Sequence, residues 1–372
     1  MNFKVSSGEL LKQLQIAGGA ISSNPIMPIL EDFLFSVSNG ALTISTSDLE
    51  SSITTTIPLT EASGDGKIAV PARILTETLK ALPDQPVTFE IDEDNFSIQL
   101  TSNYGKYRLA GENPAEFPDL PVAKHEDTVT LSSEILTKAI TKTLFAVSTD
   151  ELRPAMTGVY FQIDPTQLIC VATDAHKLVK NTFRDISTET EANFILPRKS
   201  LQLLKNALPS SEKVVLSTDN THVFFEFGHM TAACRLIDAR YPDYNAVIPV
   251  DNPNLLTLQK GDFQNSLRRI AIYANKSTNQ VVLSISDGSL TISAQDLDFS
   301  NEAKEQLPCS YTGEPMVIAF NAKFLLEMLT VIDADEIKLE LSTPNKAGIL
   351  FPADAPPEEE SLMLVMPVML SN

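Results

Sequence analysis

Apolar residues recur at helical spacing in three segments of similar sequence. They are Val70–Pro83, Leu196–Pro209 and Phe320–Asp333. Each opens with an apolar residue followed by Pro71, Pro197 or Asn321, and these positions lie 126 and 124 residues apart. Proline suits the first helical turn, where its missing N–H has no partner, and asparagine is a good helix N-cap. We therefore predict one helix in each segment.

A second helix-like pattern keeps the same period. It occupies Ser6–Ser22, Leu131–Ser148 and Leu258–Asn275. Leu10, Ile135 and Phe263 are the matching apolar positions, at separations of 125 and 128 residues. The first copy opens with Ser6 and Glu9 at the spacing of a capping box. The pattern predicts two helices in each repeat of the chain.

Runs that alternate apolar and polar residues predict strands between these helices. Three of the runs align on the aspartates Asp48, Asp174 and Asp296. Two hairpins are indicated by the turn pairs Asn39-Gly40 and Asp287-Gly288. Further extended segments are predicted at Phe96–Leu100 and His222–Phe227. Two helices and several hairpins per repeat indicate an α+β fold, with helices on one face of antiparallel sheets.

The repeat also predicts the domain organisation. The first two copies end alike, in Tyr107–Pro121 and Cys234–Pro249, which adds a fourth feature at a period of about 125 residues. We expect three modules, 1–125, 126–251 and 252–372, with junctions near His125 and Asp251 where polar, Pro- or Asn-containing stretches interrupt the pattern. The alternative is one long α+β enzyme in which the likeness is accidental.

Composition narrows the class of protein. The 372 residues are 43% hydrophobic, enough for ample cores, and their net charge is −20. This balance argues against a surface wholly coated for nucleic acid, although a local basic surface stays possible. The apolar stretch Leu362–Leu370 has nine residues, whereas a membrane span needs about 20. Three dispersed cysteines fit neither a disulfide framework nor a CxxC metal site, so we expect a cytoplasmic location.

Positive charge is concentrated on the repeated helix-like segments. Thirteen Lys and Arg lie in them or directly beside them. Glutamate forms helices as well as lysine does but is scarce there, which favours a functional cationic surface over an ordinary solvated face. Such a surface binds phosphates without reading bases. The cations expected to face DNA are Lys12, Arg73, Lys80, Lys138, Lys142, Arg198, Lys199, Lys205, Arg268, Arg269, Lys276 and Lys323. Lys260 is the thirteenth.

Short motifs add to the repeat. They are Arg153–Val159 (RPAMTGV), Thr173–Leu178 (TDAHKL), Tyr241–Tyr244 (YPDY), the VPAR that opens at Val70, and the C-terminal Val365–Leu370 (VMPVML). With these motifs in order, the whole chain resembles the bacterial DNA sliding clamp, the β subunit of the replicative DNA polymerase III. The resemblance implies three DNA-clamp modules per chain and a head-to-tail homodimer, which forms a six-module ring lined by twelve helices.

The resemblance also implies a function. Such a ring encircles double-stranded DNA without sequence specificity and tethers the polymerase as a non-catalytic processivity factor. Polymerase, clamp-loader and repair proteins compete for one pocket through a short linear motif. No cofactor and no metal are expected.

Ring closure by the family's mode joins an edge of the first module to an edge of the third. A basic edge would then meet an acidic one around an apolar centre, although each could be an ordinary edge strand defended by charge. The implied interface residues are Lys106, Tyr107, Arg108, Leu109, Ile272, Tyr273, Asp298, Glu302 and Glu305.

The resemblance places the partner pocket between the second and third modules, with the C-terminal segment as one wall. The C-terminal stretch Leu362–Leu370 contains three methionines, whose pliant side chains suit a surface that accepts several peptides, although it also fits a final buried strand. The matching positions are Met156, Thr173, Ala175, His176, Lys177, Leu178, Pro242, Val247, Thr278, Leu364, Val365, Met366, Pro367, Val368, Met369 and Leu370. Ala175, Lys177, Ala246 and Met369 depart from the family's common residues, so a more apolar pocket is expected.

An enzymatic reading rests on Asp174 and His176, which could act as a base with its orienting carboxylate. No nucleophile motif or Gly-rich phosphate loop accompanies them. Asp48 and Asp296 occupy the same place in repeats that lack the histidine, which indicates a turn role for the aspartate. We predict no catalysis; a hydrolase and a peptide-binding adaptor that forms no ring are the alternatives.

Overall fold

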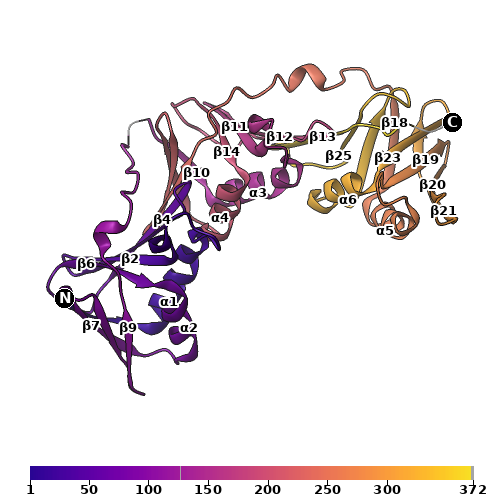
Figure 1. The fold of residues 1–372 in the computed structure, drawn as a ribbon. Coiled ribbons are helices and arrows are strands. Elements are labelled where there is room, and N and C mark those ends of the chain that lie inside the picture. Colours follow the sequence, from indigo (N-terminus) through magenta and orange to yellow (C-terminus); the bar gives the residue numbers. More distant parts are fainter. Residues whose placement is uncertain (126, 370–372) are drawn as a thin grey trace. The chain divides into compact units, whose positions relative to one another are not determined.

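The computed structural model describes residues 1–125 and 127–369 (Figure 1). The chain divides into two compact units. The first contains Met1–Thr137 and Lys199–Leu236, and the second contains Lys138–Arg198 and the chain from Ile237 onward. The middle of the sequence is therefore divided between the two units, because some of its strands belong to a sheet of the first unit and others to a sheet of the second.

The first unit contains two antiparallel sheets. One has the strand order β5-β1-β7-β8-β9. Its strands are β1 (Asn2–Ser6), β5 (Glu61–Ser63), β7 (Pro86–Asp92), β8 (Ser97–Thr101) and β9 (Lys106–Ala110). The other has the order β10-β15-β16-β17-β4-β3-β2-β6. Its strands are β2 (Asp32–Ser38), β3 (Ala41–Ser47), β4 (Ser51–Pro58), β6 (Gly66–Pro71), β10 (Val129–Ser132), β15 (Lys213–Thr218), β16 (His222–Phe227) and β17 (Met230–Arg235).

The second unit also contains two antiparallel sheets. The larger has the order β14-β11-β12-β13-β26-β25-β24-β18-β22, and the smaller β21-β20-β19-β23. The larger sheet is built from β11 (Gly158–Asp164), β12 (Gln167–Thr173), β13 (Lys177–Phe183), β14 (Ala192–Pro197), β18 (Asn254–Gln259), β22 (Ser310–Thr312), β24 (Glu336–Leu341), β25 (Gly348–Pro352) and β26 (Glu359–Val365). The smaller is built from β19 (Gln280–Ser286), β20 (Ser289–Asp296), β21 (Asn301–Pro308) and β23 (Met316–Asn321).

Six α-helices occur in the described residues, one for each predicted segment. They are α1 (Ser7–Ala17), α2 (Ala72–Ala81), α3 (Ser133–Thr143), α4 (Arg198–Ala207), α5 (Lys260–Ile270) and α6 (Ala322–Val331). Within each unit, α1 packs on α2 and α5 packs on α6, and each pair lies against strands of its own unit (Figure 1). The α+β fold with antiparallel sheets is therefore confirmed.

Helix termini show which sequence signals were correct. The Ser6 side chain accepts the backbone N–H of Glu9, and the Asn321 side chain accepts that of Lys323, so both are N-caps as predicted. Pro71 differs from its prediction, because it is the N-cap residue of α2 and ends β6. Pro197 likewise ends β14 directly before α4. A residue that closes a strand does not need the N–H that proline lacks.

The predicted turns are present, with one difference between them. Asn39 and Gly40 both have positive φ angles, as a two-residue hairpin turn of this type requires. In the Asp287-Gly288 turn only the glycine does. The aspartates at the other aligned turns accept backbone N–H groups: Asp48 from Glu50 and Ser51, Asp174 from His176 and Lys177, and Asp296 from Asp298. Their predicted turn role is confirmed.

Backbone contacts define which residues are equivalent at the ends of the three repeats. Glu112, Ile237 and Val368 each donate an N–H to the carbonyl found two residues before Pro71, Pro197 or Asn321. These three residues are therefore equivalent, and so are Leu109, Cys234 and Val365, three positions earlier in each case.

Candidate functional site

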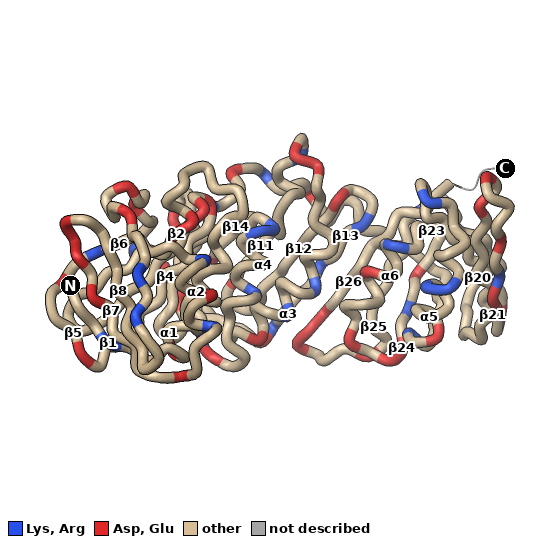
Figure 2. The backbone as a smooth tube through the Cα atoms, turned by 60° about the horizontal axis from the view of Figure 1, so that its bottom comes forward, with Lys and Arg blue, Asp and Glu red and all other residues tan. Residues whose placement is uncertain are grey.

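The predicted cationic residues lie on the helices, with one exception. Lys276 follows the short 3-10 helix Ala271–Tyr273 and lies in a turn, because α5 ends at Ile270. Figure 2 shows Lys and Arg recurring on α5 and α6, whereas Asp and Glu gather along β21 and at the start of β26. The separation of charge seen in the sequence therefore persists within the second unit.

Several of these cations are already paired with carboxylates. Lys199 forms an ion pair with Asp48, and Arg73 pairs with Glu77 one turn further along α2 at 3.2 Å. Arg269 donates two hydrogen bonds to Glu305, at 2.8 and 2.7 Å. This bidentate contact holds the pKa of Glu305 below its usual range.

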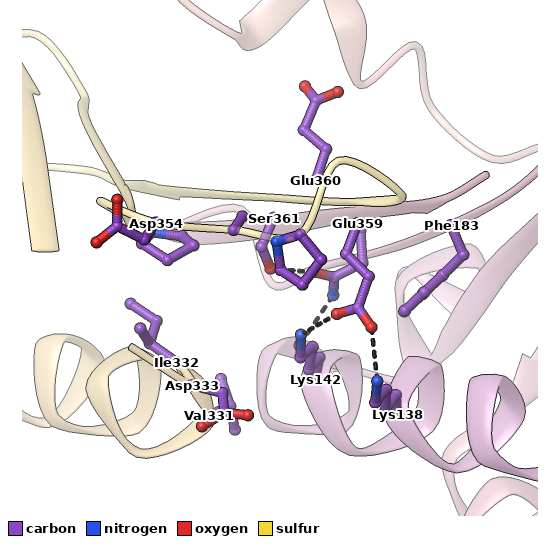
Figure 3. A pocket seen from close by; sticks show the side chains of 14 residues that line it. Lys138, Lys142, Phe183, Val331, Ile332, Asp333, Asp354, Glu359, Glu360 and Ser361 are labelled. Carbon is purple, nitrogen blue, oxygen red and sulfur yellow. Dashed lines mark hydrogen bonds and ion pairs between the residues drawn. The ribbon is translucent and has the colours of Figure 1, made fainter. Parts of the chain in front are cut away.

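Lys138 and Lys142 of α3 share one carboxylate. Their ammonium groups donate to the two oxygens of Glu359 at 2.7 and 2.9 Å, as Figure 3 shows. Burial of Glu359 opposes its ionisation, but the two lysine hydrogen bonds outweigh that effect and lower the pKa of the carboxyl. The cluster lies in a pocket of about 160 Å³ whose other walls include Phe183 and Ile332. Glu359 is therefore a fixed counter-ion that fastens the start of β26 to α3.

The other cations of the set form no ion pair within residues 1–125 and 127–369. They are Lys12, Lys80, Arg198, Lys205, Arg268, Lys276 and Lys323. All of them are exposed except Lys205, which is half-buried. Charges of this kind are available to a polyanion, whereas Lys138 and Lys142 must first leave Glu359.

The C-terminal segment continues a strand of the larger sheet in the second unit. β26 pairs with β13, so that Leu364 lies opposite Leu178 and Val365 opposite Lys177. Leu178 and Leu364 belong to a buried cluster with Tyr241 and Tyr244. Beyond the strand, Met366 donates its N–H to His176 and Val368 donates to Ala319. The predicted residues of these segments are therefore brought together.

Exposure divides the candidate pocket residues into two groups. Thr173, Lys177, Leu178, Leu364 and Val365 are buried in the fold. The other members are exposed or partly exposed: Met156, Ala175, His176, Pro242, Val247, Thr278, Met366, Pro367, Val368 and Met369. Leu370 lies outside the described residues. The exposed group can contact a partner directly, whereas the buried group fixes the strands that carry it.

Lys177 has surroundings that the sequence did not reveal. Its ammonium lies 2.7 Å from Glu327 and 3.3 Å from Asp174, and it sits 4.5 Å from the ring centre of Phe324. The His176 ring stacks on the same phenylalanine at 6.2 Å. Because Asp174 accepts the backbone N–H groups of its turn, these contacts describe a structural junction and not a catalytic dyad.

The two predicted interface edges are both open in the structure. β9 is the last strand of its sheet and β21 the last strand of another, and in the described residues neither pairs with a strand on its outer side. Lys106 and Arg108 are exposed, whereas Leu109 is 4% exposed and packs into its own unit. Ile272 and Tyr273 are exposed, Asp298 accepts from Asn275 at 3.5 Å, and Glu302 is exposed.

Two exposed apolar residues at this edge escaped the sequence reasoning. Leu297 and Phe299, in the turn between β20 and β21, are 78% and 74% exposed. They lie within an acidic run of the sequence, whose charge suggests an ordinary solvated turn and not an apolar contact. The described residues contain no cluster of His, Cys, Asp or Glu that could hold a metal ion. None of the helices in residues 1–125 and 127–369 is long and apolar enough to cross a membrane.

Comparisons with known proteins give one consistent result. Family models match the chain as the N-terminal domain of the DNA polymerase III beta subunit over residues 1–121, its central domain over 130–243 and its C-terminal domain over 245–368. Beta sliding clamps of Staphylococcus epidermidis and Staphylococcus aureus are each 29% identical over 377 residues, covering 99% of both chains.

Solved structures agree with the family models. The DNA polymerase III beta subunit of Pseudomonas aeruginosa superposes with a TM-score of 0.94 at 26% identity, over the whole of both chains. The DNA polymerase sliding clamp of Bacillus subtilis gives 0.93 at 27% identity, again over the whole of both chains. A further Pseudomonas aeruginosa clamp structure, with a TM-score of 0.93 at 26% identity over the whole of both chains, is bound to griselimycin.

Proposed function

The chain belongs to the family of DNA polymerase III β subunits, the bacterial DNA sliding clamps, and we propose that two copies close head to tail into a ring around duplex DNA. Members of this family are non-catalytic processivity factors. The chain therefore acts by topology, holding a polymerase on its template, and has no catalytic role.

One observation carries the ring proposal. Inside the chain, β17 pairs with β4 and β26 pairs with β13, so the last strand of one repeat extends a sheet of the repeat before it. Only β9 and β21 lack this continuation among the described strands that hold these repeated positions. A heterologous contact between β21 of one copy and β9 of another repeats the internal pattern and closes a ring if the rotation closes.

The proposed ring has room for DNA. Twelve helices of about 10 Å width give a lining of about 120 Å circumference, hence about 40 Å between opposite axes and roughly 30 Å clear. The opening exceeds a duplex, so retention comes from encirclement and sliding stays possible. We propose that the cations without ion pairs, such as Arg198 and Lys205, face the phosphates through counterion release.

We propose a partner site on the exposed residues around β13 and the C-terminal segment. The four exposed or partly exposed residues Met366–Met369, together with His176 and Val247, supply an apolar surface beside the buried junction that fixes it. Methionines suit a surface that must accept several peptides. Polymerase, clamp-loader and repair proteins are the proposed ligands, each through a short linear motif.

The modules 1–125, 126–251 and 252–372 and a cytoplasmic location complete the proposal. The three family models, which end at 121, 243 and 368, support a threefold division of the chain. Three free cysteines suit a reducing compartment.

The ring proposal is tested by size and by topology. We expect a particle near twice 40.7 kDa in sedimentation and stable retention on nicked circular DNA after loading. Cutting that DNA once should release the protein, because only encirclement retains it. A monomer at all concentrations, or equal retention on linear and circular DNA, would contradict the ring.

The cationic lining is tested by reversing charge. Arg198→Glu with Lys205→Glu should impair loading onto DNA by about tenfold or more, because like charge then meets phosphate. The matched control, Lys67→Glu with Lys346→Glu, changes the net charge equally at two exposed positions away from the helices. Equal loading defects in both variants would assign the effect to overall charge and not to the helices. Peptide binding should be unchanged in the control.

A further inference from the structure

The two internal junctions follow one register. In β17 and β4, Cys234 lies opposite Ser51, and in β26 and β13, Val365 lies opposite Lys177. The next residue then donates its N–H to the turn before the partner strand: Arg235 to Glu50 at 2.8 Å and Met366 to His176 at 2.9 Å. The same backbone rule is therefore used twice.

The turn also touches a fixed position on a helix. At the first junction, the Ser51 and Ser200 hydroxyls are 2.7 Å apart. At the second, Lys177 and His176 contact the ring of Phe324. Ser200 and Phe324 each lie three residues after the residue that precedes the helix, Pro197 or Asn321. The equivalent residue of α2 is Ile74, three residues after Pro71.

These equivalences predict the register at the open edges. Leu109 is equivalent to Cys234 and Val365, as the backbone contacts of Glu112, Ile237 and Val368 establish. Asn301 is equivalent to Ser51 and Lys177, because its pairing with Asp296 closes the hairpin at the aligned aspartate. Applying the rule places Leu109 opposite Asn301 and Arg108 opposite Glu302. An exposed cation then meets an exposed carboxylate.

The third turn differs from the other two in length and polarity. Two residues separate Asp48 from Ser51 and Asp174 from Lys177, whereas four, Leu297–Ser300, separate Asp296 from Asn301. The longer turn carries Leu297 and Phe299, and the helix position it must meet is Ile74, which is itself 52% exposed. The repeat thus predicts that the exposed apolar side chains of Leu297, Phe299 and Ile74 meet beside the β9–β21 junction.

We propose that Leu297 and Phe299 of one copy pack over Ile74 of a second copy, as an apolar anchor beside the β9–β21 strand pair. The inference rests on the proposed ring, and it specifies the partner, the register and the contact. Continuity with the open edges and the Arg108–Glu302 complementarity favour a second copy of this chain as the occupant. Because an apolar contact is not screened by salt, this part of the interface should persist at high ionic strength.

Dilution measurements test the anchor. Leu297→Ser with Phe299→Ser should raise the dimer dissociation constant about tenfold or more, measured by sedimentation at 0.5 M salt. Ile74→Ser should do the same, and the triple variant should lose less than the sum of both, because the side chains share one contact. The control Leu152→Ser removes a leucine that is 91% exposed elsewhere and should leave the constant unchanged. Wild-type dissociation constants in the anchor variants, or fully additive losses, would overturn the proposal.

Cross-linking tests the register. Arg108→Cys with Glu302→Cys, in a Cys309→Ser background, should form a covalent dimer on oxidation, because directly opposed residues have Cα atoms about 4.5–5.5 Å apart. Arg108→Cys with Gln306→Cys, four residues further along β21, should not. Cross-linking of the second pair would overturn the register.

The two failures are distinguishable. A wild-type protein that is monomeric and slides off circular DNA would refute the ring itself. A wild-type dimer that is retained on circular DNA, but whose Leu297, Phe299 and Ile74 variants dimerise normally, would refute only the anchor.

Discussion

The two internal junctions share a backbone pattern but are held by different side-chain chemistry. In the first unit, a buried Ser51–Ser200 hydrogen bond accompanies an ion pair of Lys199, whose side chain is 60% exposed. In the second unit, the Lys177 side chain is 6% exposed and lies between two carboxylates and an aromatic ring. Glu359 adds a second ionic cluster to the same strand pair.

The difference shows that the two junctions have the same strand pairing and register, whereas the side chains that hold them differ from one repeat to the next. A desolvated ion pair is costly to break, since the partner left behind keeps its charge in a poor solvent. An exposed cation costs little to remove where the carboxylate left behind keeps other donors, as Asp48 keeps the backbone N–H groups of Glu50 and Ser51. The junction that carries the C-terminal segment is the one whose cation is buried, so the proposed partner surface lies beside the buried ammonium of Lys177.

Removing the Lys177 ammonium should give the largest difference in stability between the two junctions. Lys177→Ala should lower the unfolding free energy of the second unit by about 3 kcal/mol, because it removes a buried side chain packed on Phe324 and leaves the partly buried Asp174 without its cation. Lys199→Ala should cost below about 1 kcal/mol in the first unit, because the lysine is exposed and the Asp48 carboxylate keeps the backbone N–H donors of its turn. Denaturant unfolding followed by hydrogen exchange in β26 and β17 reports each unit separately. Equal losses at both junctions would contradict the comparison.

Glu359→Gln should have an intermediate effect on stability and a distinct effect on DNA. Losing the charged acceptor of two lysines should cost about 2 kcal/mol in the second unit. Lys138 and Lys142 then lose the carboxylate of Glu359 as a competitor for phosphate, so the slope of log affinity for duplex DNA against log salt should steepen by up to about 0.9 per lysine. Glu360→Gln is the matched control, because it removes the same charge from a neighbouring exposed pair with Arg184.

The pH dependence of this cluster has a definite sign. Because the folded pKa of Glu359 lies below its usual value, the stability it contributes is present above that usual value and is lost as pH falls through the folded pKa. The difference between wild type and Glu359→Gln should therefore vanish in acid. An unchanged salt slope at neutral pH would show that Glu359 does not restrain these lysines.

The helices and strands could be predicted well from the sequence because each pattern occurs three times, once in each repeat. Capping residues such as Ser6 and Asn321 and the turn aspartates act within a few residues, so their roles follow from local spacing. The six helices likewise follow from apolar periodicity. The backbone equivalence of Leu109 and Cys234 did not follow, because matching letters do not fix a strand register.

The pairing of charges could not be predicted from sequence. Glu359 is one of three consecutive glutamates and looks like a solvated loop, yet it lies 221 residues from Lys138, with which it pairs. Lys177 similarly needs Glu327 and Phe324, which the fold alone brings to it. Such contacts depend on long-range strand pairing, which leaves no periodic trace in the residues concerned.

Asp32 offers the smallest and most selective test of the comparison, because it is a buried carboxyl of the first unit that forms no ion pair with any described residue. Asp32 is 6% exposed, and no described group forms a hydrogen bond with its Oδ2. Burial, with added repulsion from Glu112 and Glu31, raises its pKa to about 7. Because the folded pKa of Asp32 lies above its unfolded pKa, the stability linked to this carboxyl is fully present below the unfolded pKa. It is lost as the pH rises through about 7, the folded pKa.

Asp32→Asn should therefore stabilise the first unit by about 1 to 2 kcal/mol at pH 8 and by nothing at pH 4, after relaxation of the site is allowed for. The second unit, where the buried Asp296 accepts the backbone N–H of Asp298, should show no such gain. Glu31→Gln, at the exposed neighbouring residue, is the control and should change stability far less. Unit-resolved hydrogen exchange at the two pH values checks this. A gain in stability at pH 4, or the same gain in both units at pH 8, would mean that the unpaired carboxylate of Asp32 does not distinguish the two units.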